Sequence, residues 1–288
     1  MAGSLEHRPE TMPLPTPASE PSTTPDPVLI FDSGVGGLSV VRALRARLPG
    51  VPLAYVCDNA ALPYGTKADD WLVARIVAVC AAAVAASGAR ALVVACNTAS
   101  TLALEALRDR LAIPVVGTVP AIKPAAALSH SGVIGLLATS ATVCRPYTDR
   151  LIADFAAGRT VVRVAADTLV AQAERLIAGE PVDPAALDRG LAPLWANPAL
   201  DTVVLGCTHF PLLEDVLAER APRPVQWVDS GAAIARRVAQ VLDPLPPADA
   251  RADDPAWATG PVSPGLTRGF AGFGFGEPRS LLLPASRD

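Results

Sequence analysis

Short apolar runs alternate with longer segments of helical periodicity along most of this chain, and this alternation constrains the fold more than any other feature. A continuous apolar run is typical of a strand buried on both faces, and a helix after it returns the chain to begin a parallel neighbour. The pattern therefore predicts an α/β fold in which helices cover a parallel sheet. The predicted strands are Val28–Phe31, Leu53–Cys57, Ala91–Ala95, Val115–Gly117, Gly132–Leu137, Thr160–Val164 and Thr202–Leu205.

The segments between these strands carry helix signals. Asp69 or Asp70 can cap a helix whose apolar residues recur at helical spacing up to Gly88, which fits a C-terminal cap. Hydrophobic residues are 51% of the chain but aromatic residues only 5%, so Ala, Val and Leu must build the core. The other predicted elements are a helix ending near Leu48, helices over Ala99–Leu111, Ala121–Leu128, Leu169–Ala178, Pro184–Trp195 and Glu214–Glu219, a late strand at Trp257–Gly260 and edge structure at Ser280–Leu283.

The strand and helix pattern starts again near Val119, which predicts two similar parallel-sheet α/β domains with the active site in the cleft between them. The N-terminal residues are rich in Pro, Ser, Thr and Glu and cannot bury enough apolar surface to fold. We expect a disordered extension over 1–27, a first domain over 28–119 and 230–288 with a loop at 243–256, and a second domain over 120–229.

Charge and hydropathy exclude several classes of function. The net charge is −4 with no basic patch, which argues against nucleic acid as the main partner. No apolar run reaches the ~18 residues of a membrane span, because Arg75 interrupts the longest one, Val73–Ala86. The first 27 residues contain no apolar signal-peptide core, and the five cysteines are an odd number set mostly in apolar runs rather than a disulfide framework. We therefore predict a protein of the reducing cytoplasm.

Two cysteines occupy the same place in the two halves. Val93–Thr98 and Val204–His209 each contain an apolar strand, a small residue, a cysteine and two hydrogen-bonding residues. Ligands of open α/β sheets bind at the carboxyl ends of the strands, and a helix that starts after the cysteine favours its thiolate. A single cysteine after a strand is more often a small buried hydrophobe, and this interpretation applies to Cys57, Cys80 and Cys144.

The matched pair, Cys96 and Cys207, could bind a metal, form a redox disulfide or act as acid and base. The chain contains no Cys-x-x-Cys and no His-x-x-x-His, so no metal or redox spacing is present and acid–base chemistry remains. His209 follows Cys207 by two residues and has an ordinary pKa of ~6.5. Asp32 ends the first strand, and the glycines after it allow the backbone to approach an anion such as a substrate carboxylate.

Several separated motifs together resemble the glutamate racemases. The likeness covers roughly residues 28–242, and no single motif carries it. The motifs that carry it are Phe31–Val40, Asp58–Gly65, Ala95–Ser100, Pro114–Gly117, Leu205–Leu213 and Asp229–Gly231.

This resemblance implies an isomerase that interconverts L-glutamate and D-glutamate for bacterial peptidoglycan synthesis, without pyridoxal phosphate, another cofactor or a metal. Cys96 corresponds to the thiol that takes the α-proton from D-glutamate, assisted by Asp32. Cys207 corresponds to the thiol that takes it from L-glutamate, assisted by His209. Glu174 corresponds to a further acidic residue near the site, although Ala166-Asp167 stands where Cys-Pro is common. The implied substrate contacts are Asp32, Ser33, Pro63, Tyr64, Gly65, Asn97, Thr98, Thr139, Thr208 and His209.

Other interpretations stay open at this point. The rival within the superfamily is a racemase of another acidic amino acid such as aspartate, although the Pro63–Gly65 and Cys207–Pro211 motifs favour glutamate. The resemblance also implies a homodimer, since dimers are usual in the family, and allows a second role as an inhibitor of DNA gyrase. Because Cys96 depends on Asp32 and Cys207 on His209, we expect the two directions of the reaction to respond differently to pH and to mutation.

Overall fold

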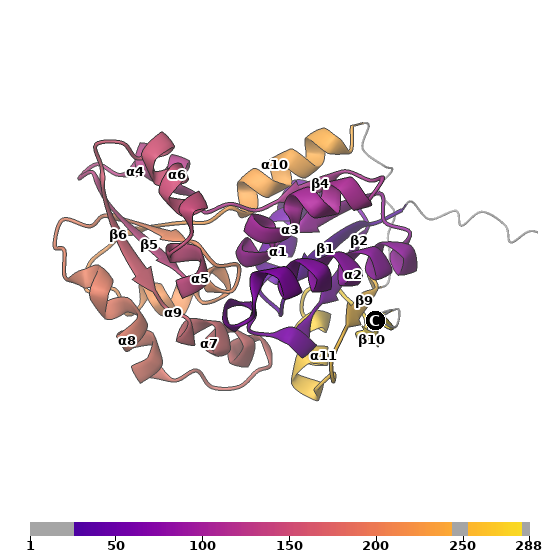
Figure 1. Ribbon diagram of the computed structural model, residues 1–288. Coiled ribbons are helices and arrows are strands. Elements are labelled where there is room, and N and C mark those ends of the chain that lie inside the picture. Colours follow the sequence, from indigo (N-terminus) through magenta and orange to yellow (C-terminus); the bar gives the residue numbers. More distant parts are fainter. Residues whose placement is uncertain (1–25, 244–252, 284–288) are drawn as a thin grey trace, which may run out of the picture.

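The computed structural model describes residues 26–243 and 253–283. They form two α/β units side by side, each with its own parallel sheet (Figure 1). Both units are of the predicted class, so the predicted fold is confirmed. Of the predicted extension only Asp26 and Pro27 are described, and most of the predicted loop over 243–256 lies outside the described residues. The last residue of that loop, Ala256, instead begins a strand by pairing with Tyr55.

The larger sheet has six strands in the order β10-β9-β2-β1-β3-β4, and every pairing in it is parallel. All residues of its central strands β1 and β2 are buried, because helices cover both faces. Its strands are β1 (Val28–Asp32), β2 (Leu53–Cys57), β3 (Ala91–Val94), β4 (Val115–Gly117), β9 (Ala256–Ala258) and β10 (Arg279–Ser280).

Two helix pairs cover this sheet. On one face α1 (Leu38–Arg47) packs against α10 (Gly231–Val241). On the other face α2 (Asp69–Ser87) packs against α3 (Asn97–Arg110). By length and composition alone, α2 could cross a membrane, and it is the one such helix in the part of the chain that the structure describes. Its apolar stripe, which includes Leu72 and Ile76, instead packs on the sheet.

The smaller sheet has four parallel strands in the order β6-β5-β7-β8. Its strands are β5 (Val133–Ala138), β6 (Thr160–Ala165), β7 (Thr202–Leu205) and β8 (Gln226–Val228). Its helices are α4 (Ile122–Leu128), α5 (Ser140–Val143), α6 (Pro146–Phe155), α7 (Thr168–Ile177), α8 (Pro184–Trp195) and α9 (Glu214–Ala218).

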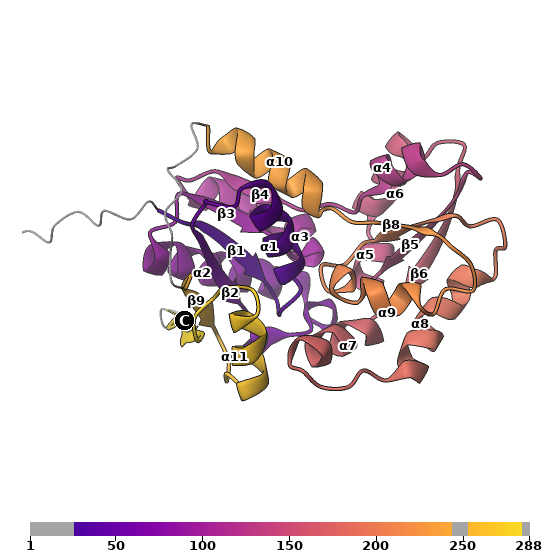
Figure 2. The same ribbon diagram turned by 180° about the vertical axis from the view of Figure 1, so that it is seen from behind.

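The chain passes from the larger to the smaller sheet between β4 and α4 and returns between β8 and α10. Figure 2 shows these connections on the same side of the molecule as α10. On the opposite side, α11 (Pro264–Ala271) of the larger unit contacts α7 of the smaller one, and Arg268 donates to the Ala178 carbonyl there. We propose the predicted boundaries, near residues 119 and 229, for the two domains.

Local expectations held where the signal was a backbone requirement. Gly88 ends α2 in the left-handed conformation with φ 64°, as predicted. Asp69 is the first residue of α2 rather than its cap, so that prediction was wrong: Ala68 precedes the helix with no side-chain cap, and the Asp69 carboxylate binds Arg145 instead. The helices α10 and α11 and the strand β8 were not predicted, because α10 and α11 start beside Ser-Gly and Ser-Pro-Gly turn signals and β8 has only three residues.

Candidate active site

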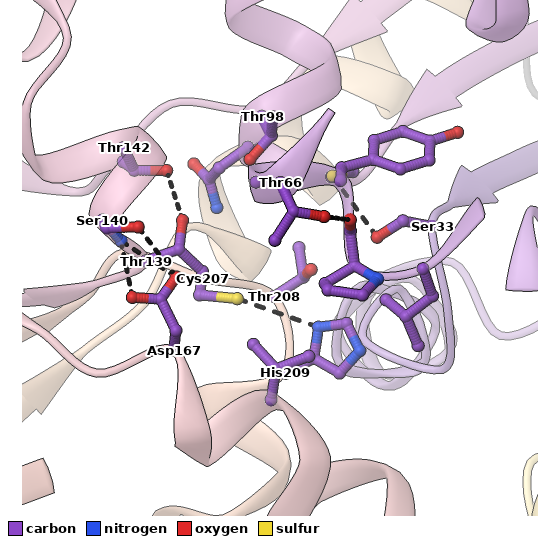
Figure 3. A pocket seen from close by; sticks show the side chains of 17 residues that line it. Ser33, Thr66, Thr98, Thr139, Ser140, Thr142, Asp167, Cys207, Thr208 and His209 are labelled. Atoms are coloured by element: carbon purple, nitrogen blue, oxygen red, sulfur yellow. Dashed lines mark hydrogen bonds between the residues drawn. The ribbon is translucent and has the colours of Figure 1, made fainter. Parts of the chain in front are cut away.

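The carboxyl ends of strands from both sheets meet at one cavity of about 190 Å³ (Figure 3). This volume is smaller than the roughly 300–1,000 Å³ of drug-sized ligand pockets, and suits a small metabolite. None of the residues that line it is Lys or Arg, so hydroxyl, amide and backbone N–H groups and His209 must meet any anionic ligand. Of the predicted site residues, the wall contains Ser33, Pro63, Tyr64, Gly65, Cys96, Asn97, Thr98, Thr139, Cys207, Thr208 and His209.

Cys96 lies two residues after the end of β3 and forms the N-cap of α3, as predicted for a thiol at a helix N-terminus. Its sulfur lies 3.7 Å from the Ser33 hydroxyl. Burial nevertheless raises the pKa of the Cys96 thiol to about 12, helped by the nearby charges of Asp32 and Cys207, whereas hydrogen bonds from the Ala99 amide and Ser33 lower it only in part. The helix N-terminus therefore does not make this thiol acidic in the empty cavity, because desolvation is the larger effect.

Cys207 has different surroundings. No α-helix starts immediately after it, contrary to prediction; a turn leads into a short 3₁₀ helix at Phe210–Leu212. The Cys207 sulfur lies 3.7 Å from His209 Nδ1, and Figure 3 shows the sulfur directed at this ring. His209 Nε2 lies 2.7 Å from Glu174 Oε1. Cys207, His209 and Glu174 thus form a chain of three titratable groups that ends on the cavity.

The charge state of His209 is set by its two neighbours. Its side chain is buried, which opposes protonation, but the hydrogen bonds to Cys207 and Glu174 outweigh burial and raise its pKa well above 6.5. These hydrogen bonds therefore favour the cationic form of the imidazole, with a proton on both ring nitrogens. A cation beside a thiol favours the thiolate, which is the form of a cysteine that acts as a base.

Asp32 lies behind the cavity wall rather than on it. It is fully buried, and its Oδ1 accepts from the Gly34 amide at 2.9 Å and from the Ser33 hydroxyl at 3.4 Å. Its Oδ2 accepts from the Thr208 hydroxyl at 2.8 Å. Burial raises the pKa of Asp32 above 3.8, opposed by the charge of His209. Through Ser33 the carboxylate reaches toward Cys96, and through Thr208 it reaches the smaller unit.

The glycines after Asp32 serve the protein's own side chains rather than an anionic ligand. A Cβ on Gly34 would lie 2.1 Å from Glu174 Oε1, and a Cβ on Gly36 would lie 2.5 Å from His209 Nδ1. Glu174 Oε1 also accepts from the Val35 amide at 2.9 Å. The expected approach of a substrate carboxylate to these glycines is therefore wrong, because side chains of the smaller unit occupy that space.

Three polar side chains of the wall differ in their hydrogen bonding. Asn97 Oδ1 is buried and has no hydrogen-bond partner, which suits a donor on a bound molecule. The Tyr64 hydroxyl, expected to contact a ligand, instead donates to Asp58 Oδ2 at 2.7 Å, and the residue lines the wall with its other atoms. Thr139 pairs with Thr142 at 3.2 Å.

Part of the cavity wall consists of residues that were not predicted from the sequence. Leu62, Ser140, Thr142, Asp167 and Val170 also line the cavity, and so does Thr66, which follows the predicted contacts Pro63–Gly65. The Asp167 carboxylate accepts from the Ser140 amide and hydroxyl at 3.1 Å. The position of Asp167, two residues after β6, would have indicated it, because every strand of a parallel sheet ends at the same edge.

Comparison with known proteins agrees with this geometry. The family model of Asp/Glu/Hydantoin racemase matches residues 38–238. The glutamate racemase of Sphingopyxis alaskensis is 50% identical over 220 residues, which are 75% of this chain and 82% of the relative. That of Salmonella gallinarum is 49% identical over 241 residues, 83% of this chain and 85% of the relative. The crystal structure of Escherichia coli glutamate racemase in complex with L-glutamate and the activator UDP-MurNAc-ala has a TM-score of 0.85 at 44% identity, and covers 91% of this chain and 100% of that one.

Proposed function

We propose that this chain, which belongs to the Asp/Glu/Hydantoin racemase family, interconverts L-glutamate and D-glutamate by passing the α-proton between Cys207 and Cys96. Because about half of its aligned residues are identical to those of glutamate racemases, the chain is an isomerase of that type. The observation that carries the mechanism is that two thiols, one from each sheet, line a single small cavity. Inversion of a stereocentre needs a base on one face of the carbon and an acid on the other.

In the direction from L-glutamate, the Cys207 thiolate takes the α-proton and the Cα–H bond breaks. The electron pair passes into the α-carboxylate, and the Cys96 thiol then donates its proton to the opposite face. Atoms and charge balance, since one thiolate is consumed and another is formed. The high pKa of Cys96 supports its role as the acid in this direction, because it stays protonated at neutral pH.

The carbanion needs stabilisation, since the α-proton of an amino acid is only weakly acidic. Asn97 and Thr98 at the start of α3, and Thr208 after β7, offer amide and hydroxyl groups to the substrate. Such donors count for more inside a cavity that excludes water. Among the described residues no group of three or more His, Cys, Asp or Glu is arranged to hold a metal ion, and each step proposed here uses side chains of the chain itself.

The test is racemisation in deuterium oxide. Incubation with L-glutamate should give D-glutamate that carries deuterium at Cα. Chiral chromatography measures the D-isomer, and loss of the α-proton signal in NMR measures the label. Incubation with D-glutamate should give labelled L-glutamate. Absence of inverted product in both directions would disprove the proposed activity. L-Aspartate in the same assay tests the rival substrate, and we expect much slower turnover because one methylene fewer places its side-chain carboxylate differently.

The cellular role follows from the product. D-glutamate serves peptidoglycan synthesis, and we place the enzyme in the cytoplasm, where its thiols stay reduced. The crystal structure of the E. coli relative contains L-glutamate and the activator UDP-MurNAc-ala, which supports glutamate as the substrate here. The predicted homodimer and the contact with DNA gyrase stay predictions, to be checked by light scattering and by a supercoiling assay.

A further inference from the structure

A second network of buried polar groups lies just outside the cavity, at the end of β2. The Asp58 side chain is fully buried and accepts hydrogen bonds from three side chains. Arg75 Nη2 donates to Oδ1 at 2.7 Å and Arg75 Nε to Oδ2 at 3.0 Å. Tyr64 donates to Oδ2 at 2.7 Å, and Thr259 to Oδ1 at 2.5 Å. A carboxylate with donors on both oxygens has one fixed orientation.

The three donors come from different parts of the fold. Arg75 lies on α2, Tyr64 in the segment 62–66 that lines the cavity, and Thr259 directly after β9. Asp58 itself is tied to the catalytic region, because its amide donates to the Asp32 carbonyl at 2.9 Å. Asp58 thus connects the wall of the cavity, the larger sheet and residues 256–261, the C-terminal return segment, which contains β9 and the residues after it.

The Tyr64 hydroxyl serves as an anchor in this network. The residue is 3% exposed, and its ring contacts Phe31 with centroids 6.5 Å apart. Burial and, as a smaller effect, the charge of Asp58 raise the pKa of Tyr64 well above 10, so the phenol remains a donor. Pro63, Gly65 and Thr66 beside it line the cavity. Their positions therefore depend on the bond from Tyr64 to Asp58.

The C-terminal return segment supports the corner from which 62–66 departs. The Gly260 amide donates to Asn59 Oδ1 at 2.7 Å, and Asn59 Nδ2 donates to the Pro261 carbonyl at 2.9 Å. A Cβ on Gly260 would lie 3.1 Å from the Ala60 nitrogen, so the two chains approach as closely as a glycine allows. Support of this kind limits how far the segment 62–66 can move away from the cavity.

We propose that Asp58 is a positioning residue that holds the segment 62–66 against the substrate through Tyr64, and that Thr259 transmits support from the C-terminal return segment through the same carboxylate. This inference rests on the proposed racemase function and concerns substrate affinity rather than proton transfer. It assigns to Tyr64 a role in which the hydroxyl touches Asp58 and not the substrate.

The experiment compares Tyr64→Phe, Thr259→Val and the double variant with the wild-type enzyme in steady-state racemisation of L-glutamate. Tyr64→Phe keeps the ring contact with Phe31 and removes one hydrogen bond to a charged group. We expect KM to rise about tenfold, with kcat changed less than about twofold. Thr259→Val should raise KM less. The double variant should raise KM by less than the product of the two single effects, because both act through one carboxylate.

KM separates positioning from loss of folded enzyme, since a smaller folded fraction lowers only the maximal rate. The matched control is Tyr147→Phe, on α6 and outside the cavity wall, which should leave both constants unchanged. A KM of Tyr64→Phe within about twofold of wild type would overturn the proposal, as would a fall in kcat at constant KM. A wild-type enzyme inactive on glutamate would instead refute the proposed function.

Discussion

The two thiols of the cavity occupy matching places in the fold and have unlike surroundings. Cys96 follows β3 and stands at the N-cap position of a helix of 14 residues, and its sulfur lies 3.7 Å from the Ser33 hydroxyl. Cys207 follows β7 and precedes a turn, and its neighbour is His209 with Glu174 behind it. One thiol therefore has dipoles and a buried carboxyl nearby, whereas the other has a cation.

This difference teaches that inversion does not require symmetric surroundings. L- and D-glutamate have equal free energies, so kcat/KM must be the same for both at every pH and in every variant. The two reactive enzyme forms carry the same number of protons and differ only in which thiol holds the shared one. The expectation that the two directions respond differently therefore applies to kcat and KM separately, and cannot apply to their ratio.

The largest effect should come from removing either thiol. Cys96→Ala and Cys207→Ala should each lower racemisation by about 10³-fold or more, because acid–base catalysis from one face is lost. Each variant keeps one base, so Cys96→Ala should still exchange the α-proton of L-glutamate with deuterium oxide, and Cys207→Ala that of D-glutamate. NMR of the recovered enantiomer measures this exchange.

Cys144→Ala is the control for this pair, since Cys144 is exposed and outside the cavity. The opposite pattern of exchange, with Cys96→Ala acting on D-glutamate, would reverse the assignment of the two faces. Full racemisation by either variant would remove the two-base mechanism.

The next effect tests the cation beside Cys207. His209→Asn should lower kcat about 10²-fold, and Glu174→Gln about tenfold. Because Glu174 raises the His209 pKa, Glu174→Gln should also make kcat fall at a lower pH on the alkaline side. The control is Glu180→Gln, on the surface near Arg175. An unchanged pH profile in Glu174→Gln would show that Glu174 does not set the charge of His209.

The contact between Glu174 and His209 should also make the stability of the protein depend on pH, in a definite direction. A group whose pKa is raised on folding stabilises the protein fully below its unfolded pKa, about 6.5 for histidine, and loses this effect as pH rises through the folded value. Glu174→Gln should therefore lower the free energy of unfolding more at pH 6 than at strongly alkaline pH. Urea denaturation at several pH values measures this. An equal loss at all pH values would contradict the linkage.

Asp32, which lies near Cys96, should show opposite effects of one substitution on activity and on stability. Its raised pKa means that burial of the ionised carboxylate costs folding free energy above pH 3.8, and that this cost disappears as pH falls. Asp32→Asn keeps the shape and an acceptor for the Gly34 amide. We expect Asp32→Asn to lower kcat. We also expect it to raise the free energy of unfolding relative to wild type, and to raise it more at pH 7 than at pH 4. A loss of stability at pH 7 would contradict the cost of burial.

The smallest effect should come from the ion pair between the two units. Arg145, just after α5, makes two hydrogen bonds of 2.9 Å to Asp69 at the start of α2. The pair is partly exposed, so Arg145→Gln should change stability by only ~0–1 kcal/mol. We expect KM to rise about twofold at low salt, and wild type to approach the variant at high salt. A KM that changes neither with the Arg145→Gln substitution nor with salt concentration would show that this contact does not hold the units together.

The sequence predicted most of what depends on local pattern. The strand β2 and the left-handed Gly88 follow from apolar runs and turn chemistry, and Cys96 and Cys207 were paired by their equivalent places after strands. Local signals failed at Asp69, which pairs across the cleft instead of capping its helix, and after Cys207, where Pro211 accompanies a 3₁₀ turn.

The sequence alone thus determined an α/β chain with thiols at the ends of two parallel sheets, because strand alternation and strand ends are local properties. Only the tertiary structure decided which groups serve each thiol. Glu174 reaches the Val35 amide across 139 positions of sequence, and Thr208 reaches Asp32 across 176. Those contacts depend on how the two sheets face each other, and no local spacing records that orientation.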